Sequence, residues 1–212
     1  MRLTTLALVL ALPAALAMTG TAHADDQVRN APPFTSISVQ GPMSVTVDAG
    51  KAQSLTVRGD RRFIEDLMTE VVDGELRVRL RDKKNRKWEG DPRVVITVPA
   101  LRAIDVEGAG EIRLNQIRGE RLDVNYRGAG SMSINGEVKT FKMLAEGVGE
   151  VNAKSFIADD VNATFHGIGE VRVFARNRLD AVVQGMGNLI YYGKPRTVNK
   201  SASGIGSVRA GD

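Results

Sequence analysis

The chain has 212 residues, of which 42% are hydrophobic and 25% charged; its formal net charge is +4 and it has no cysteine. This balance is typical of one globular domain or two small ones and excludes a chain that is disordered throughout. The absence of cysteine excludes disulfides, thiolate metal sites and cysteine nucleophiles, and the small positive charge argues against a nucleic-acid-binding protein.

Residues 1–24 have the pattern of a secretory signal peptide. Arg2 supplies a positive start, residues 3–18 are an apolar stretch, and Ala22 and Ala24 place small residues where a signal peptidase needs them. The apolar stretch is shorter than the ~20 residues that a transmembrane helix needs, which favours cleavage over anchoring. We therefore expect an exported mature protein that begins at Asp25 and has no transmembrane segment.

Residues 25–33 are expected to form a linker, and residues 34–100 an irregular β region. Apolar residues alternate around Gly41-Pro42, as they do in strands with one buried face. After residues 34–47, the expected elements are a strand at 55–57, one or two helical turns at 61–68, a hairpin at Asp73-Gly74 with a second strand at 75–81, a charged loop at 82–92 and a strand at 94–98. We predict that these segments extend or cap the regular part of the chain.

Seven basic residues fall within residues 77–87. Arginine alternates with an apolar residue from Arg77 to Arg81, which predicts a strand with one solvated face. One interpretation is a patch for acidic envelope polymers or lipid phosphates. The favoured interpretation is a solvated hairpin edge, where positive charge discourages edge-to-edge pairing of sheets.

A Gly-x-Gly triplet recurs six times after residue 101, at intervals of 18 to 20 residues. The triplets are Gly108-Ala109-Gly110, Gly128-Ala129-Gly130, Gly147-Val148-Gly149, Gly167-Ile168-Gly169, Gly185-Met186-Gly187 and Gly204-Ile205-Gly206. Apolar residues occupy every second position on both sides of each triplet, and the alternation changes phase across it. Each repeat is therefore predicted as strand, glycine corner, strand and second turn, because glycine tolerates positive φ and close backbone approach.

A fixed period near 20 residues is typical of a solenoid. The predicted fold is all-β: a parallel β-helix of ~20-residue coils, in which residues 34–100 are irregular with one short helix and residues 101–212 form six coils of the same domain. A leucine-rich repeat shares the period, but its Leu-x-x-Leu-x-Leu core does not recur here. A calcium-binding nonapeptide roll is excluded because its aspartates are absent.

Two columns of polar residues flank the triplets. The residues before them are Glu107, Arg127, Glu146, His166, Gln184 and Ser203, and those after them are Glu111, Ser131, Glu150, Glu170, Asn188 and Ser207. Both columns are predicted to face solvent along one edge, where Glu150 and Glu170 would lie one coil apart. A hydrated cation with oxygen ligands, or the hydroxyls of a sugar, would bind at such an edge. The favoured alternative is a wet edge without a ligand, where the charge of Arg127 partly balances the neighbouring glutamates.

The aromatic residues give few candidates for a ligand-binding surface. Tyr126, Phe141, Phe165 and Tyr191 have inward parity, which leaves Tyr192 and Trp88, the latter in the basic loop. Trp88 could stack on a sugar, insert at a membrane surface or pack over the end of the coil. The candidate ligand-binding residues are Glu111, Glu150, Glu170, Arg127 and Trp88; no catalytic, cofactor or metal site is predicted.

The motifs together resemble a known family of bacterial envelope proteins. They are a Phe-x-x-Ile-x-Val-x-Gly-Pro-x-x-Val-x-Val opening from Phe34, Val-x-Gly-Asp from Val57, Asp-Gly-x-Leu from Asp73, and the serial Gly-x-Gly repeats. This combination resembles the autotransporter-adhesin head domain called the GIN domain, a family of unknown function. The resemblance spans about residues 34–208. It implies a right-handed β-helix in the periplasm or at the cell surface, with adhesion or polysaccharide binding, and it offers no catalytic residues.

Three functions follow from these patterns. The first is non-catalytic binding of an envelope or extracellular polymer, and the second is docking of another envelope protein through the stacked face or a coil end. The third is a polysaccharide lyase or hydrolase, which only fold analogy supports. We expect no enzyme, since His166 is the only histidine after residue 24 and no nucleophile motif accompanies it.

Overall fold

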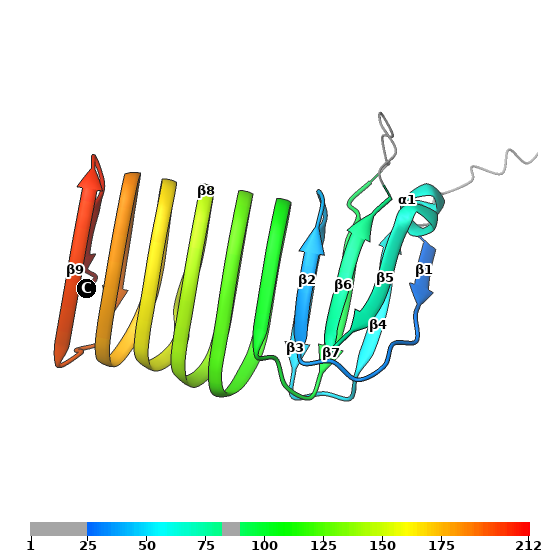
Figure 1. The fold of residues 1–212 in the computed structure, drawn as a ribbon, viewed down its shortest axis with the longest axis horizontal. Helices are drawn as coiled ribbons and strands as arrows, with labels where there is room; N and C mark the ends of the chain where they lie inside the picture. Colours follow the sequence, from blue (N-terminus) through cyan, green and yellow to red (C-terminus); the bar gives the residue numbers. More distant parts are fainter. Residues whose placement is uncertain (1–24, 82–89) are drawn as a thin grey trace, which may run out of the picture.

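The computed structural model describes residues 25–81 and 90–212. The predicted signal peptide and Trp88 lie outside these residues. The described part is mostly β structure with one short helix, and its strands form one mixed sheet (Figure 1). The elements are β1 (Asp25–Val28), β2 (Ser36–Gln40), β3 (Ser44–Ala49), β4 (Ser54–Gly59), α1 (Arg61–Asp66), β5 (Leu67–Val72), β6 (Glu75–Leu80), β7 (Arg93–Val98), β8 (Ala103–Tyr192), β9 (Thr197–Gly204) and β10 (Ser207–Ala210).

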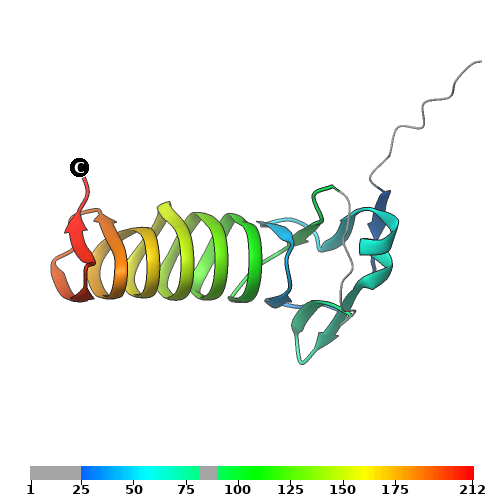
Figure 2. The ribbon, with the colours of Figure 1, turned by 90° about the horizontal axis from the view of Figure 1, so that it is seen from above.

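β8 is a single strand of 90 residues that winds in successive turns lying side by side (Figure 2). In its first turn, residues 103–107 pair in parallel with β2, and residues 112–115 pair in parallel with β3. Each turn thus has two straight segments, with the glycine triplet between them. The predicted corner does not interrupt the strand, because pairing to the neighbouring turn continues through the triplet.

The triplets allow this continuous pairing because their backbones stack without side chains. Gly128 has a φ of +152°, and a Cβ placed on it would overlap the carbonyl oxygen of Gly108 in the preceding turn. The predicted positive φ is found in every triplet glycine except Gly187 and Gly206. At Gly187 the reason for glycine is different, since the ring of Phe165 occupies the space that a Cβ would need.

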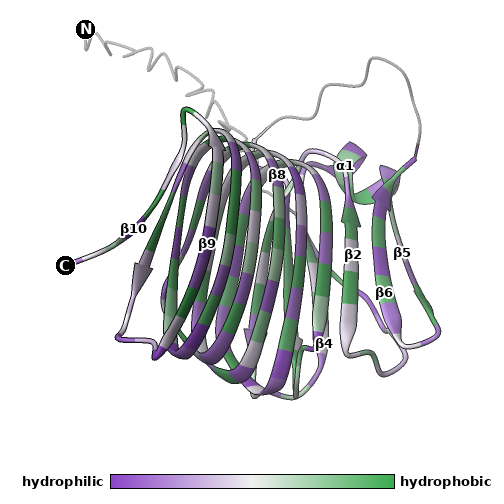
Figure 3. Cartoon of the chain, turned by 60° about the vertical axis from the view of Figure 1, so that its left-hand side comes forward, coloured by the Kyte–Doolittle hydropathy of each residue, from purple (hydrophilic) through white to green (hydrophobic). Residues whose placement is uncertain are grey.

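The core runs through the middle of the turns. The alternation predicted from the sequence is confirmed along β8, where inward side chains are buried and their neighbours face solvent (Figure 3). Phe141 packs edge-on against Phe156, with ring centroids 5.0 Å apart. Tyr126 and Phe165 are buried as predicted, and Tyr191 is partly buried against the same core. Burial of each large apolar side chain contributes roughly 1.5–3 kcal/mol relative to exposure.

β2 and β3 form one further turn at the start of the stack, as the alternation around Gly41 predicted. β2 pairs with β8 on one side and β6 on the other, and β3 lies between β8 and β7. Residues 25–33, expected to be a linker, include β1, which pairs antiparallel with β4. The segment is ordered by this pairing, which the sequence pattern did not show.

The hairpin at Asp73-Gly74 is confirmed. Both residues have positive φ, +52° and +76°, as a type I′ turn requires, and they join β5 to β6 in antiparallel register. The arginines of β6 face solvent as predicted. The expectation of a hairpin edge is wrong for them, since β6 lies between β2 and β5, and β5 is the outer strand.

Helix α1 ends earlier than expected, at Asp66. Asp60 caps its N-terminus, since its Oδ1 accepts a hydrogen bond of 2.6 Å from the backbone N–H of Phe63. Leu67 has extended dihedral angles and is buried, so it starts β5 rather than continuing the helix to residue 68. Tertiary pairing of β5 with β6 therefore overrides the local helical pattern.

A half-buried guanidinium links the end of β1 to α1 and β5. Arg29 donates hydrogen bonds of 2.7 and 2.6 Å to the carbonyl oxygens of Leu67 and Ile64, and a bond of 3.1 Å to Thr69 Oγ1. Partial burial lowers the pKa of Arg29 from its usual value. These bonds hold the first strand to the outer strand of the hairpin.

Candidate binding surfaces

The triplet edge is the row of six glycine triplets together with the polar residue on either side of each. Its central feature is an exposed apolar row, formed by the residue between the two glycines of each triplet. Among the described residues, five large hydrophobic side chains are exposed, and four of them belong to this row: Val148 (54%), Ile168 (45%), Met186 (54%) and Ile205 (84%). The first two turns carry Ala109 and Ala129 at the same place, so the apolar row widens toward the C-terminal turns.

The sequence has an apolar residue between the two glycines of every triplet but does not show which way it points. The glycines on both sides change the phase of the alternation, so that the residue between them faces outward. Because those glycines carry no side chains, they do not cover the apolar side chain between them. The sequence does contain a signal for this exposed row, because an apolar residue recurs at a position that lies out of phase with the buried residues.

Ion pairs across turns connect the polar column before the triplets. Arg127 Nε lies 3.0 Å from a carboxylate oxygen of Glu146 in the next turn, and His166 Nδ1 lies 3.5 Å from the other oxygen of that carboxylate. Arg127 thus balances a neighbouring acid, as the wet-edge interpretation predicted. His166 lies in β8 on this edge.

The column after the triplets is also balanced by the chain itself. Arg172 contacts the carboxylates of both Glu150 and Glu170, and Arg113 lies 2.6 Å from Glu111. Glu150 and Glu170 therefore lie together as predicted, and a guanidinium relieves the repulsion for which a cation was considered. In the described ranges, no group of three or more His, Cys, Asp or Glu side chains is arranged to hold a metal ion.

The predicted site residues are therefore distributed along the triplet edge rather than gathered in one cavity. Glu150 and Glu170 share Arg172, Arg127 lies in the opposite column, and Glu111 lies in the first turn. All four have solvent-accessible side chains. Arg172, which is not among the predicted ligand-binding residues, is the candidate that the structure adds to this edge.

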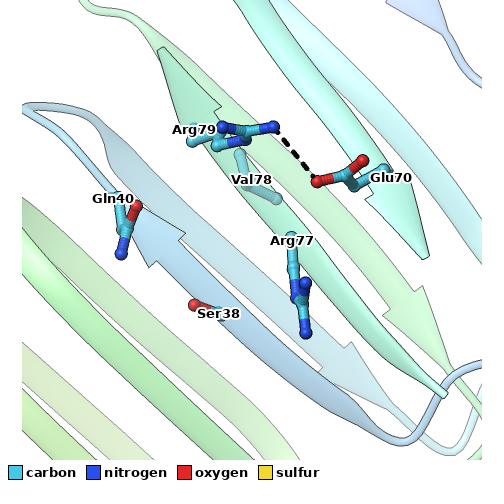
Figure 4. A pocket seen from close by; sticks show the side chains of 6 residues that line it. All are labelled: Ser38, Gln40, Glu70, Arg77, Val78 and Arg79. Atoms are coloured by element: carbon cyan, nitrogen blue, oxygen red, sulfur yellow. Dashed lines mark hydrogen bonds and ion pairs between the residues drawn. The ribbon is translucent and has the colours of Figure 1, made fainter. Parts of the chain in front are cut away.

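A second candidate surface is a hollow of 340 Å³ on the outer face of β2, β5 and β6 (Figure 4). Arg77 and Arg79 project from β6 into this hollow, beside Gln40 of β2 and Glu70 of β5. Arg79 pairs with Glu70 at 3.3 Å, and Arg77 pairs with Glu75 at 2.9 Å. The hydrogen bond that Arg77 donates to the Glu75 carboxylate raises the pKa of Arg77. Because both arginines have acidic partners, this face offers little free positive charge for an acidic polymer.

The fold and these surfaces define a mostly β protein whose repeated sequence places polar and apolar residues in rows along one edge. The sequence also identifies the family. Residues 33–195 match the family described as "Putative auto-transporter adhesin, head GIN domain". The chain therefore belongs to this family, as its motifs predicted. No curated protein shows significant sequence similarity to the chain.

A solved structure shows the same fold. A crystal structure named as a "putative adhesin" from Bacteroides fragilis NCTC 9343 superposes with a TM-score of 0.72 at 21% identity, covering 90% of this chain and 98% of that one. Similarly named proteins give TM-scores of 0.49 (Parabacteroides merdae ATCC 43184; 18% identity, 91% and 98% coverage) and 0.47 (Parabacteroides distasonis ATCC 8503; 18%, 89% and 97%). Within the described residues, no helix has both the length and the apolar composition that crossing a bilayer requires.

Proposed function

We propose that the protein is an exported, non-catalytic binding protein of the bacterial envelope, built as a right-handed parallel β-helix. The winding of β8, its parallel pairing with β2 and β3, and the stacking of Gly128 on Gly108 support coils of about 20 residues. Membership of an adhesin family and the sequence of residues 1–24 support export. Mass spectrometry of protein secreted by a bacterial host tests it, with a mature chain expected to start at Asp25.

The proposed ligand is an extended envelope or extracellular polysaccharide that lies along the triplet edge. The observation that carries this proposal is the exposed apolar row flanked by two polar columns, repeated once per turn. Neighbouring turns are spaced about 4.8 Å apart. The apolar faces of sugar rings would pack on the row, while their hydroxyls would bond to the carboxylates and amides of the columns. The ion pairs to Arg127 and Arg172 hold these acids in place before binding.

Binding to a panel of neutral and acidic polysaccharides, with and without calcium, tests this function. The decisive variant is Glu111→Ala/Glu150→Ala/Glu170→Ala, and the matched control is Asp26→Ala/Glu65→Ala/Glu137→Ala. The control removes the same charge from exposed ion pairs away from the triplet edge. We expect saturable binding to one polymer that the first variant loses and the control keeps. Equal binding by both variants would exclude these glutamates as the binding site.

The exposed apolar row specifically favours a second function, the docking of another envelope protein on the same edge. Protein interfaces bury apolar side chains at their centre, and an exposed apolar patch is typical of such a surface. Ile168→Ser/Met186→Ser would then abolish capture of one envelope protein, whereas loss of the three glutamates would leave capture intact. The reverse pattern would favour the polysaccharide.

A further inference from the structure

The first turn of β8 departs from the repeat on the edge opposite the triplets. Six residues before the triplet, the next four turns carry a buried apolar residue: Leu122, Phe141, Val161 and Leu179. The first turn carries Arg102 at this position, and the structure buries Leu101 in its place. Arg102 is thereby turned outward, into a groove of 700 Å³ that it shares with Arg118. A volume of this size is within the range of small-ligand sites.

We call this groove the arginine groove, after Arg102 and Arg118. Its acidic residues are paired, whereas these two arginines are not, within the part of the chain that the structure describes. Its acids already have partners: Asp123 accepts hydrogen bonds of 2.8 and 2.9 Å from Arg121, and Glu120 lies 2.8 Å from Lys139 outside the groove. Arg102 and Arg118 have no ion pair with any residue in 25–81 or 90–212. Among the described residues, these two guanidinium groups therefore have no acidic partner.

Backbone hydrogen bonds fix the main chain at Arg102 and two residues before Arg118. The N–H of Arg102 donates to Thr35 at 2.8 Å, and its carbonyl oxygen accepts from Asp123 at 2.9 Å. Arg118 follows Gln116, whose φ of +57° turns the chain and whose N–H donates to Asn135 Oδ1 at 2.8 Å. Fixed backbones lower the cost of ordering the side chains around a ligand, which strengthens binding.

We infer that the arginine groove binds the carboxylate of an acidic sugar in a uronic-acid polysaccharide. A guanidinium forms paired hydrogen bonds with a planar carboxylate, and two such groups suit one acidic sugar. Ala100, Leu101 and Ala103 line the groove beside them and would contact the apolar face of the ring. An anionic membrane suits the groove less well, since Glu120 and Asp123 also line it and the exposed large hydrophobic residues of the apolar row lie on the opposite edge.

Calorimetric titration of the protein with tri-galacturonate at 150 mM salt tests the inference, with neutral tri-galactose as the reference ligand. The test variant is Arg102→Gln/Arg118→Gln. The control is Arg58→Gln/Arg178→Gln, which removes the same charge from exposed arginines paired with Asp26 and Asp180. We expect saturable binding of the acidic trimer alone, weakened about tenfold for each arginine lost from the groove and less than about twofold in the control. Arg102→Lys/Arg118→Lys should restore only part of the affinity, because lysine keeps the charge but lacks the planar fork.

Three outcomes would overturn the inference: no saturable binding of tri-galacturonate, equal weakening in the two double variants, or tighter binding to anionic lipid vesicles than to the trimer. Thermal unfolding checks that the variants fold, which the exposure of both arginines leads us to expect. The proposal for the arginine groove does not depend on the proposed binding of a polysaccharide at the triplet edge. The glutamate variant should keep tri-galacturonate binding, and the groove variant should keep binding at the triplet edge, so the two proposals can fail separately.

Discussion

The two halves of the molecule are held together by different kinds of contact. In residues 25–81 and 90–100, antiparallel pairs and side-chain contacts join the outer strands to the parallel ones, as when Arg29 links the end of β1 to β5. In residues 101–212, one turn lies on the next through parallel pairing and stacked glycine backbones, as at Gly128 on Gly108. The first half therefore depends on particular side chains, whereas the second depends on their absence at the triplets. Variants of each half test this difference.

The largest effect is expected from Gly128→Ala. The new methyl group would overlap the carbonyl oxygen of Gly108, and backbone on both sides prevents relief, so we expect a loss of about 4 kcal/mol or more in unfolding free energy. Gly74→Ala is the control, since Gly74 also has positive φ but no atom lies within 4 Å of the added carbon. It should cost only about 1 kcal/mol of backbone strain. Equal losses in urea unfolding would show that stacking is not what requires glycine.

Arg29→Met should have the next largest effect. It leaves the carbonyl oxygens of Leu67 and Ile64 without their donor, at a cost of about 2–3 kcal/mol. Hydrogen exchange should show faster exchange in β1, α1 and β5 with little change in β8. Arg58→Met, which removes only an exposed pair with Asp26, should change stability by less than about 1 kcal/mol. Uniform acceleration throughout β8 would mean that the two halves unfold as one unit.

A smaller effect should appear in the pH dependence of stability. Asn115 donates a hydrogen bond to Asp48 at 2.9 Å, and this bond, followed by one from Lys51, lowers the pKa of Asp48. Because the folded pKa is below the unfolded value of about 3.9, the stabilisation is present above that value and is lost as pH falls through the folded pKa. Asn115→Ala should therefore lose less stability than the wild type between pH 5 and pH 2. An unchanged slope in chemical unfolding would show that this bond does not set the pKa.

The smallest effect on stability is expected from Ile168→Ser. Its side chain is 45% exposed and lies outside the core, so the unfolding free energy should change by no more than about 0.5 kcal/mol. Phe165→Ser, three residues earlier and buried, should destabilise the same turn by several kcal/mol. A large loss for Ile168→Ser in thermal unfolding would mean that the apolar row supports the fold rather than a partner.

Much of the repeat half could be predicted from sequence, because its period is local. The alternation fixed which residues of β8 are buried, and the triplet spacing fixed which glycines meet. The irregular half was predicted less well. The segment at residues 25–28 became β1, and the helical pattern at 61–68 ended at Asp66, because pairing with strands distant in sequence decided both.

The candidate sites show the same division. Sequence columns placed Glu150 beside Glu170, but only the structure brought Arg172 between them. The sequence also showed Arg102 as an exception within an apolar column without showing that it lines a groove with Arg118. Side chains on separate turns meet according to rotamer and register, which alternation does not encode.

The sequence by itself determined the mostly β class, the repeat, the family and the inward face of each turn, because these depend on spacing along the chain. Only the tertiary structure decided that the strand continues through the triplets, that the residue between the glycines faces outward, and which charges remain unpaired. Those properties depend on contacts between turns about 20 residues apart and on the free energy of placing each polar group against its neighbours.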